Sequence, residues 1–390
     1  MRRETRGGWV ALGVCVLVAS ALLGLRAPRA RGQDLAFAGS VQASYLFSPT
    51  SPADLHHAFD GFTTEASLKV SADVGDHVSA QVKACFGCHG FELGMAFVDF
   101  RVADELNLRV GRFSPSFGEF PLRHDPANHH TVDKPLVYDM GRMLRMREWN
   151  LGILPIPYVD QGIEVNGTHW CDGTAQVDYA VYVVGGLRGT TEPFDIDWIE
   201  TRSLGRYYVD DNASPAGGAR VGFAFNLGEE AALSFGASGM YGLYDPDATR
   251  SYLIVGADLY ARWGPLTLRA EYLLRRTEFA LGDDPASRFA YGPGENGQFD
   301  DFFLKDGWYA DVEIRLHPAV ELIGRFDGLR RIGNVAATSP LRSESMILRY
   351  TAGFNFIPDR AFRIKLFSQL YDFSDFADEV TIQAAVAANF

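Results

Sequence analysis

Polar and apolar residues alternate along most of this chain. Between residues 63 and 74, for example, Leu68 and Val70 alternate with Lys69 and Ser71, so that one face of an extended backbone is apolar and the other is polar. A period of two residues is typical of a β-strand whose two faces meet different environments. The pattern therefore predicts strands rather than helices.

The same pattern predicts about sixteen strands. They span residues 35–47, 63–74, 77–86, 91–102, 106–113, 160–170, 175–185, 219–227, 231–243, 252–263, 266–276, 307–316, 320–329, 345–356, 361–371 and 379–390. An even number of antiparallel strands is a feature of bacterial transmembrane barrels.

Short and long connections between these strands alternate strictly. Tight turns such as Gly75-Asp76 and Gly264-Pro265 are followed by long segments such as 114–159 and 277–306. This rhythm is expected when each hairpin has one end in the periplasm and the other outside the cell. We therefore predict an all-β fold: a closed antiparallel transmembrane β-barrel with short periplasmic turns and long extracellular loops. The alternative is a soluble β-sandwich or propeller.

The first 32 residues differ from the rest. Arg2, Arg3 and Arg6 precede an uncharged run from Trp9 to Leu25, and small residues follow near Ala30. This pattern predicts a cleaved signal peptide, residues 1–32, with a retained anchor helix as the alternative. The barrel is then expected to occupy residues 33–390, with 114–159 as a long loop that folds inward.

Charge narrows the choice of partners. The 390 residues carry a formal net charge of −13; without residues 1–32, 30 basic and 48 acidic residues remain, a net charge of −18. Binding to nucleic acid requires a basic surface, so nucleic acid is not an expected partner.

The chain ends on VTIQAAVAANF, which places Ile382, Val386 and Phe390 on one face. This last strand resembles the C-terminal signature of bacterial outer-membrane proteins, and residues 106–122 resemble the strand and following loop of phosphate-selective porins. Together with the hairpin rhythm, the resemblance to the general porin class covers essentially the whole chain after residue 32. It implies a bacterial outer-membrane location, passage of small hydrophilic solutes or ions, and a homotrimer.

The polar faces of the predicted strands would line a water-filled lumen. The basic residues on these faces are Lys69, Lys83, Arg109, Arg220, Arg262, Arg269, Arg275, Arg315, Arg325, Arg349, Arg363 and Lys365. The acidic residues are Glu65, Asp73, Glu164, Asp178, Asp258, Glu271, Asp311, Glu313, Glu321 and Asp327.

The long loop adds further charges. If it folds inward, as the resemblance implies, Glu119, Asp125, Asp133 and Asp139 would face wall arginines across a narrow passage and create a transverse field. The alternative is that these carboxylates only solvate the lumen.

A separate motif, Cys85-Phe86-Gly87-Cys88-His89, has the sequence of a c-type haem attachment site. Cys85 and Cys88 would form the thioethers, and His89 would supply an axial nitrogen to the iron. Candidate sixth ligands are His124, His129, His130, Met140, Met143 and Met146. The alternatives are a Cys85–Cys88 disulfide and a metal site that uses the cysteines with His89.

No nucleophile–base pair or carboxylate dyad stands out in the sequence, so we do not expect an enzyme. The leading hypothesis is an outer-membrane porin, with or without covalent haem c. The alternative is an outer-membrane haem protein that serves electron transfer at the cell surface.

Overall fold

The computed structural model describes residues 33–49, 61–87, 90–126, 128–139, 152–171, 173–192 and 212–390. The predicted signal peptide lies outside the described residues, as do Cys88 and His89 of the CxxCH motif. None of the helices in the described part is long and apolar enough to cross a membrane.

The described residues form sixteen strands and three short helical turns. The strands are β1 (Gln33–Phe47), β2 (Gly61–Val74), β3 (Val78–Gly87), β4 (Gly90–Ala103), β5 (Leu106–Phe113), β6 (Asp160–Cys171), β7 (Ala175–Val184), β8 (Ala216–Asn226), β9 (Ala231–Leu243), β10 (Ser251–Trp263), β11 (Leu266–Glu278), β12 (Phe302–His317), β13 (Val320–Ile332), β14 (Glu344–Asp359), β15 (Phe362–Phe373) and β16 (Glu379–Asn389). The helical turns are η1 (Phe120–Arg123), η2 (Leu136–Tyr138) and α4 (Pro285–Arg288).

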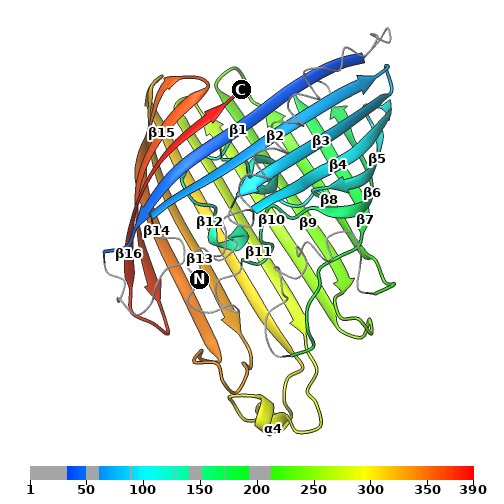
Figure 1. Ribbon diagram of the computed structural model, residues 1–390, viewed down its shortest axis with the longest axis vertical. Coiled ribbons are helices and arrows are strands. Elements are labelled where there is room, and N and C mark those ends of the chain that lie inside the picture. Colours follow the sequence, from blue (N-terminus) through cyan, green and yellow to red (C-terminus); the bar gives the residue numbers. More distant parts are fainter. Residues whose placement is uncertain are drawn as a thin grey trace, which may run out of the picture.

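The strands close into one antiparallel barrel (Figure 1). Each strand pairs with its neighbours in sequence, and β1 closes the ring by pairing with β16, with Val41 opposite Ala388 and Phe47 opposite Ile382. Closure leaves no unpaired strand edge, which is the condition for crossing hydrocarbon with β-structure. The predicted fold class is confirmed.

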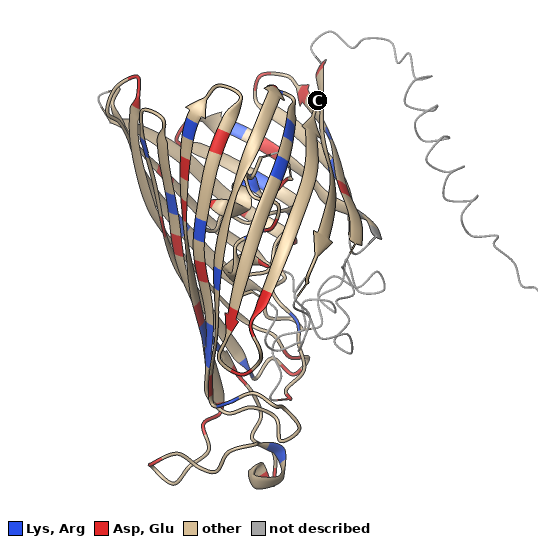
Figure 2. Cartoon of the chain, turned by 90° about the vertical axis from the view of Figure 1, so that its left-hand side faces the viewer, with Lys and Arg blue, Asp and Glu red and all other residues tan. Residues whose placement is uncertain are grey.

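The two faces of each strand meet different environments, as the alternation predicted. On β15, Ile364, Leu366 and Leu370 point outward and are about 40% exposed, whereas Lys365 and Gln369 point inward and are buried. This is the reverse of a soluble protein, in which apolar rows pack inside. Charged residues recur along the strands that surround the lumen (Figure 2). The outer surface is therefore suited to lipid and the interior to polar contacts.

Two strands begin three or more residues earlier than predicted. β8 starts at Ala216 instead of residue 219, because Gly217 and Gly218 offer no contrast between the two faces. β12 starts at Phe302 instead of residue 307, because Asp306 interrupts the apolar outer row. Asp306 accepts two hydrogen bonds of 3.0 Å from Arg330 of β13, which gives this outward carboxylate a cationic partner.

The long connections gather at one end of the barrel, where the loop that carries α4 projects furthest (Figure 1). There, Phe289 forms an isolated β-bridge with Ala336, so the β11–β12 and β13–β14 connections pack on each other. The short turns lie at the opposite end, in agreement with the predicted rhythm of the hairpins.

Candidate functional site

The candidate site is built around residues 114–139, which follow β5 and are called the inner segment below. It runs inside the barrel (Figure 1). Phe117, Phe120 and Tyr138 of this segment are almost fully buried and share a hydrophobic cluster with Tyr309 of β12 and Leu329 of β13. The inner segment therefore packs through apolar side chains inside a lumen whose wall is largely polar.

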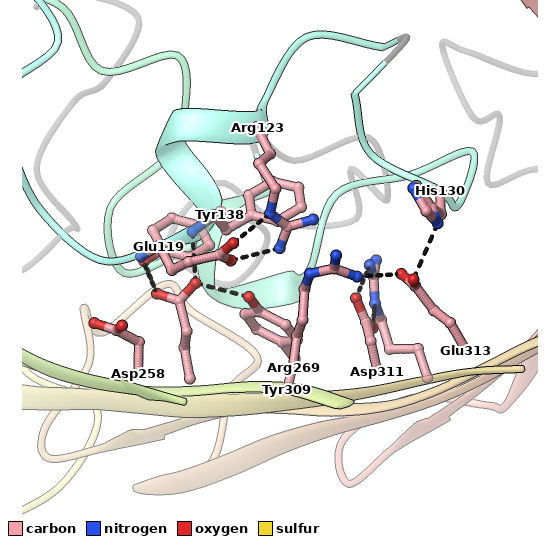
Figure 3. Close-up of polar contacts among 12 residues, drawn as sticks. Glu119, Arg123, His130, Tyr138, Asp258, Arg269, Tyr309, Asp311 and Glu313 are labelled. Carbon is pink, nitrogen blue, oxygen red and sulfur yellow. Dashed lines mark hydrogen bonds and ion pairs between the residues drawn. The ribbon is translucent and has the colours of Figure 1, made fainter. Parts of the chain in front are cut away.

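A carboxylate of the barrel wall accepts hydrogen bonds from the start of the inner segment (Figure 3). The Glu271 side chain of β11 accepts hydrogen bonds from the backbone N–H groups of Glu119 (3.3 Å) and Phe120 (2.7 Å). It also accepts from the hydroxyls of Tyr138 (2.5 Å) and Tyr309 (2.7 Å). Four donors on one buried carboxylate fix the position of η1 relative to β11 and β12.

Strands β13 and β14 bind the backbone further along the inner segment. Arg325 donates to the carbonyl of Asp133 (2.9 Å), and Arg349 donates to the carbonyl of Lys134 (2.6 Å). Asp327 accepts from the N–H of Leu136 (2.8 Å). Because these wall groups bind main-chain atoms, they hold the path of the inner segment whatever its side chains are.

Lys365 of β15 makes the densest of these contacts. Its ammonium group is fully buried and donates to three backbone carbonyls of the inner segment, those of Pro126 (2.8 Å), His129 (2.9 Å) and Thr131 (3.0 Å). The side-chain oxygen of Gln42 on β1, 2.9 Å away, is a fourth acceptor, so the three N–H groups of the ammonium are shared among four oxygens. The carbonyls of Pro126, His129 and Thr131 thus surround the buried ammonium group of Lys365.

On β3, Lys83 contacts two neighbouring residues of the inner segment. It pairs with Asp125 (2.5 Å) and lies 3.3 Å from Nε2 of His124, whose Nδ1 is 2.6 Å from the carbonyl of Pro121. Burial and the Lys83 ammonium lower the pKa of His124 to about 4. Burial disfavours the charge on Asp125, but His124 and Lys83 outweigh it and lower the pKa of that carboxyl. His124 is therefore neutral near pH 7 and accepts from Lys83.

In the described part of the chain, six of the twelve basic residues predicted to line the lumen pair with carboxylates of the wall. The pairs are Arg109 with Asp99 and Glu164, Arg220 with Asp258, Arg269 with Glu313, Arg315 with Glu321, Arg325 with Asp311, and Arg349 with Asp327. Arg363 differs, because its Nε and Nη1 are buried and have no hydrogen-bond partner among the described residues. These ion pairs join adjacent strands, except for Arg220 of β8 and Asp258 of β10, which pair across β9.

The carboxylates of the inner segment have partners close by. Glu119 pairs with Arg123 in its own segment, at 2.6 Å through both oxygens, and Asp125 pairs with Lys83. Asp133 accepts from Gln383 of β16, and Asp139 lies 3.9 Å from Arg349. Of the four carboxylates predicted to face wall arginines, Asp139 thus lies near one, whereas Glu119 pairs with Arg123 of its own segment.

A cavity of about 450 Å³ lies between the inner segment and strands β5 to β10. Ser116, Glu119 and Leu122 form its inner side. Its outer side is formed by inward residues of the wall, among them Arg109, Glu164, Asp178, Arg220 and Asp258. It is partly open and bounded by charged residues from five different strands and the inner segment.

The CxxCH hypothesis stays a prediction. Cys85 lies near the end of β3, opposite Ser67 on β2, while Cys88 and His89 fall outside the described residues. Of the proposed sixth ligands, His124 bonds to Lys83, and Nδ1 of His130 lies 3.0 Å from Glu313. Met140, Met143 and Met146 also lie outside the described residues. In the described part of the chain, no three His, Cys, Asp or Glu side chains form a metal site.

The sequence placed Glu271, Asp327 and Lys365 on the inner face but did not predict that they bind the inner segment. Nor did it predict the apolar cluster around Phe120 and Tyr309. Residues 113–138 are less apolar than the chain as a whole, so their composition did not indicate this cluster.

The chain was compared with known proteins. No protein-family model matches the sequence, and no curated protein matches it. Solved structures with a similar fold do exist, and their sequence identity to this chain is low.

An anion-selective porin from Comamonas acidovorans aligns over 92% of this chain and 100% of its own, with 12% identity and a TM-score of 0.53. OmpF from Salmonella typhi, solved with daunomycin, covers 92% and 98%, with 10% identity and a TM-score of 0.53. The trimer form of OmpT, an outer membrane protein of Vibrio cholerae, covers 92% and 99%, with 9% identity and a TM-score of 0.51. At these identities the likeness concerns the fold, which is that of outer-membrane porin barrels.

Proposed function

We propose that this chain is a bacterial outer-membrane porin that passes small hydrophilic solutes or ions. The observation that carries the proposal is the charged cavity between the inner segment and strands β5 to β10, inside a closed barrel with an apolar outer surface. A barrel of this size encloses a lumen, and a segment fixed inside it narrows the lumen without filling it.

The anchoring of the inner segment supports passive diffusion. Its backbone is bound by Glu271, Arg325, Asp327, Arg349 and Lys365, all of them buried side chains of the wall. A constriction held in this way has a constant width, so it sorts solutes by size and charge. A homotrimer is our expectation for the assembly, since one structural neighbour is a trimer form.

Conductance in a planar lipid bilayer tests the proposal. The purified, folded protein should produce stepwise increases in current that stay open at low voltage, and the same preparation after heat denaturation should produce none. A folded barrel that inserts into the bilayer but gives no steps would contradict the proposal. Electron transfer at the cell surface, the alternative from the sequence, gains no support from the described residues.

A further inference from the structure

The space between the inner segment and the barrel wall differs between the two sides of the lumen. Towards β12 to β15, the wall binds the backbone of the inner segment directly, as in the bond from Arg349 to the Lys134 carbonyl. Towards β5 to β10, the wall meets the segment at Ser116 and Gly118, and the cavity of about 450 Å³ opens beside these contacts. The route for a solute therefore lies along β5 to β10.

The charges that line this route are unequal. Four carboxylates face the cavity, those of Glu119, Glu164, Asp178 and Asp258, against two guanidinium groups, those of Arg109 and Arg220; a third guanidinium group, that of Arg123, pairs with Glu119. These carboxylates come from the inner segment and three different strands, so they shape the potential along the route rather than forming a ligand set for one ion.

Both guanidinium groups are engaged by carboxylates. Arg220 Nη2 lies 2.9 Å from Oδ1 of Asp258, and Nη1 contacts the other oxygen. Arg109 binds Asp99 through two bonds of 2.8 and 3.1 Å and lies 3.5 Å from Glu164. The positive charges on this wall are thus compensated.

Asp178 of β7 is different. Its oxygens accept hydrogen bonds from two neutral groups, the hydroxyl of Thr168 (2.6 Å) and the side-chain amide of Gln176 (2.8 Å). Among the described residues, no Lys, Arg or His forms an ion pair with it. Asp178 therefore contributes a negative charge to the cavity that no ion pair within the described residues compensates.

We propose that the passage along β5 to β10 prefers small cations over anions, and that Asp178 is a specificity-determining residue. A narrow route with low-dielectric walls and an excess of one sign raises the local concentration of the opposite ion. The loop between β11 and β12 adds exposed carboxylates at its end of the barrel, including Asp283, Asp284 and Glu295. The inference rests on the proposed channel function.

The test is the reversal potential of the channel in a planar bilayer with a KCl gradient. The unaltered protein should be more permeable to K⁺ than to Cl⁻. Asp178→Asn, which keeps both hydrogen-bonding neighbours, should lower the K⁺ to Cl⁻ permeability ratio about twofold, because one unit charge acts through a few ångströms of water. Asp178→Lys should move the ratio further in the same direction and gives a second variant if the first folds poorly.

Asp76→Asn is the matched control, because Asp76 is an exposed aspartate in the turn between β2 and β3. It should leave the permeability ratio unchanged. A preference for Cl⁻ in the unaltered protein, or an unchanged ratio in both Asp178 variants, would overturn this inference while leaving the channel function intact. A total lack of current steps would instead count against the channel itself.

Discussion

Strands β12 to β15 and strands β5 to β10 use their inward polar residues for different purposes. On β12 to β15, buried side chains such as Lys365, Arg349 and Asp327 bind the backbone of the inner segment. On β5 to β10, Arg109 binds a carboxylate of the adjacent strand β4, Arg220 binds Asp258 across β9, and both arginines line the cavity. Strands β12 to β15 thus hold the inner segment in place, and strands β5 to β10 provide the charged groups that a solute would contact.

Burial explains why the first arrangement is rigid. A hydrogen bond to a charged group contributes about 1.5–3 kcal/mol, and a buried donor or acceptor that loses its partner costs about 1–3 kcal/mol. Detaching the inner segment would deprive several such buried groups of hydrogen-bond partners at once, including Glu271 and Lys365. Side chains that face the cavity can exchange a lost partner for water, so changes there should affect ion preference more than structure.

The largest effect is expected for Lys365→Met. The change removes the ammonium group from the three carbonyls of residues 126, 129 and 131 and from Gln42, and water has little access to these acceptors. We expect the attachment of the inner segment to weaken by about 3 kcal/mol or more. The current should become larger and noisier, and trypsin should cut after Arg123 in the folded barrel; Lys134 is not a site, because Pro135 follows it.

Lys69→Met is the matched control for this experiment, because Lys69 is an inward lysine of β2. It should leave both the current noise and the tryptic pattern unchanged. If Lys365→Met gives the same single-channel record and the same fragments as the unaltered protein, the inner segment does not depend on the wall of β15.

The second prediction concerns acid. Burial and Lys83 lower the pKa of His124 to about 4, whereas in a detached, solvated segment it would return towards 6.5. Detachment therefore takes up a proton between about pH 6.5 and 4, so the attachment weakens as the pH falls through this window, by at most about 3 kcal/mol. Asp125, whose pKa is lowered, loses its contribution below this window.

Hydrogen exchange of residues 114–126 as a function of pH measures this effect. The protection factor, which is the intrinsic exchange rate divided by the observed rate at the same pH, should fall in the unaltered protein from about pH 6 towards pH 4. His124→Gln keeps a donor for the Pro121 carbonyl and an acceptor for Lys83, but it does not titrate, so its profile should be flatter. Identical profiles for the two proteins would show that His124 is not the group that responds to acid.

The sequence was sufficient to predict the barrel because lipid and lumen impose opposite demands on alternate residues of every strand. The predicted strand boundaries were less accurate where the two faces of a strand differ little, as at Gly217 in β8 and at Asp306 in β12. There the strands extend past the residues at which the apolar outer row ends, and hydrogen bonding to the neighbouring strand continues without it.

The site was predicted only in part, because its contacts join residues far apart in the chain. The pair of Glu119 with Arg123 has a spacing of four residues and could be read locally. The acceptance of the Phe120 N–H by Glu271 depends on the register of β11 and on the path of the inner segment, 151 residues away. Alternation gives the face of each residue but not its partner across the lumen.

The smallest effect is expected for Gly222→Ala on the open side of the lumen. An added Cβ would lie 3.8 Å from Nη2 of Arg220 and 4.0 Å from Cβ of Asp178, which is ordinary contact. Stability should stay within about 1 kcal/mol, and single-channel conductance should fall only slightly, because one methyl group enters the cavity. Gly118→Ala is the opposite case, since φ is +64° and the Cβ would lie 2.6 Å from Oε2 of Glu271. Equal effects of the two substitutions on conductance noise and thermal unfolding would contradict the division into a fixed side and an open side.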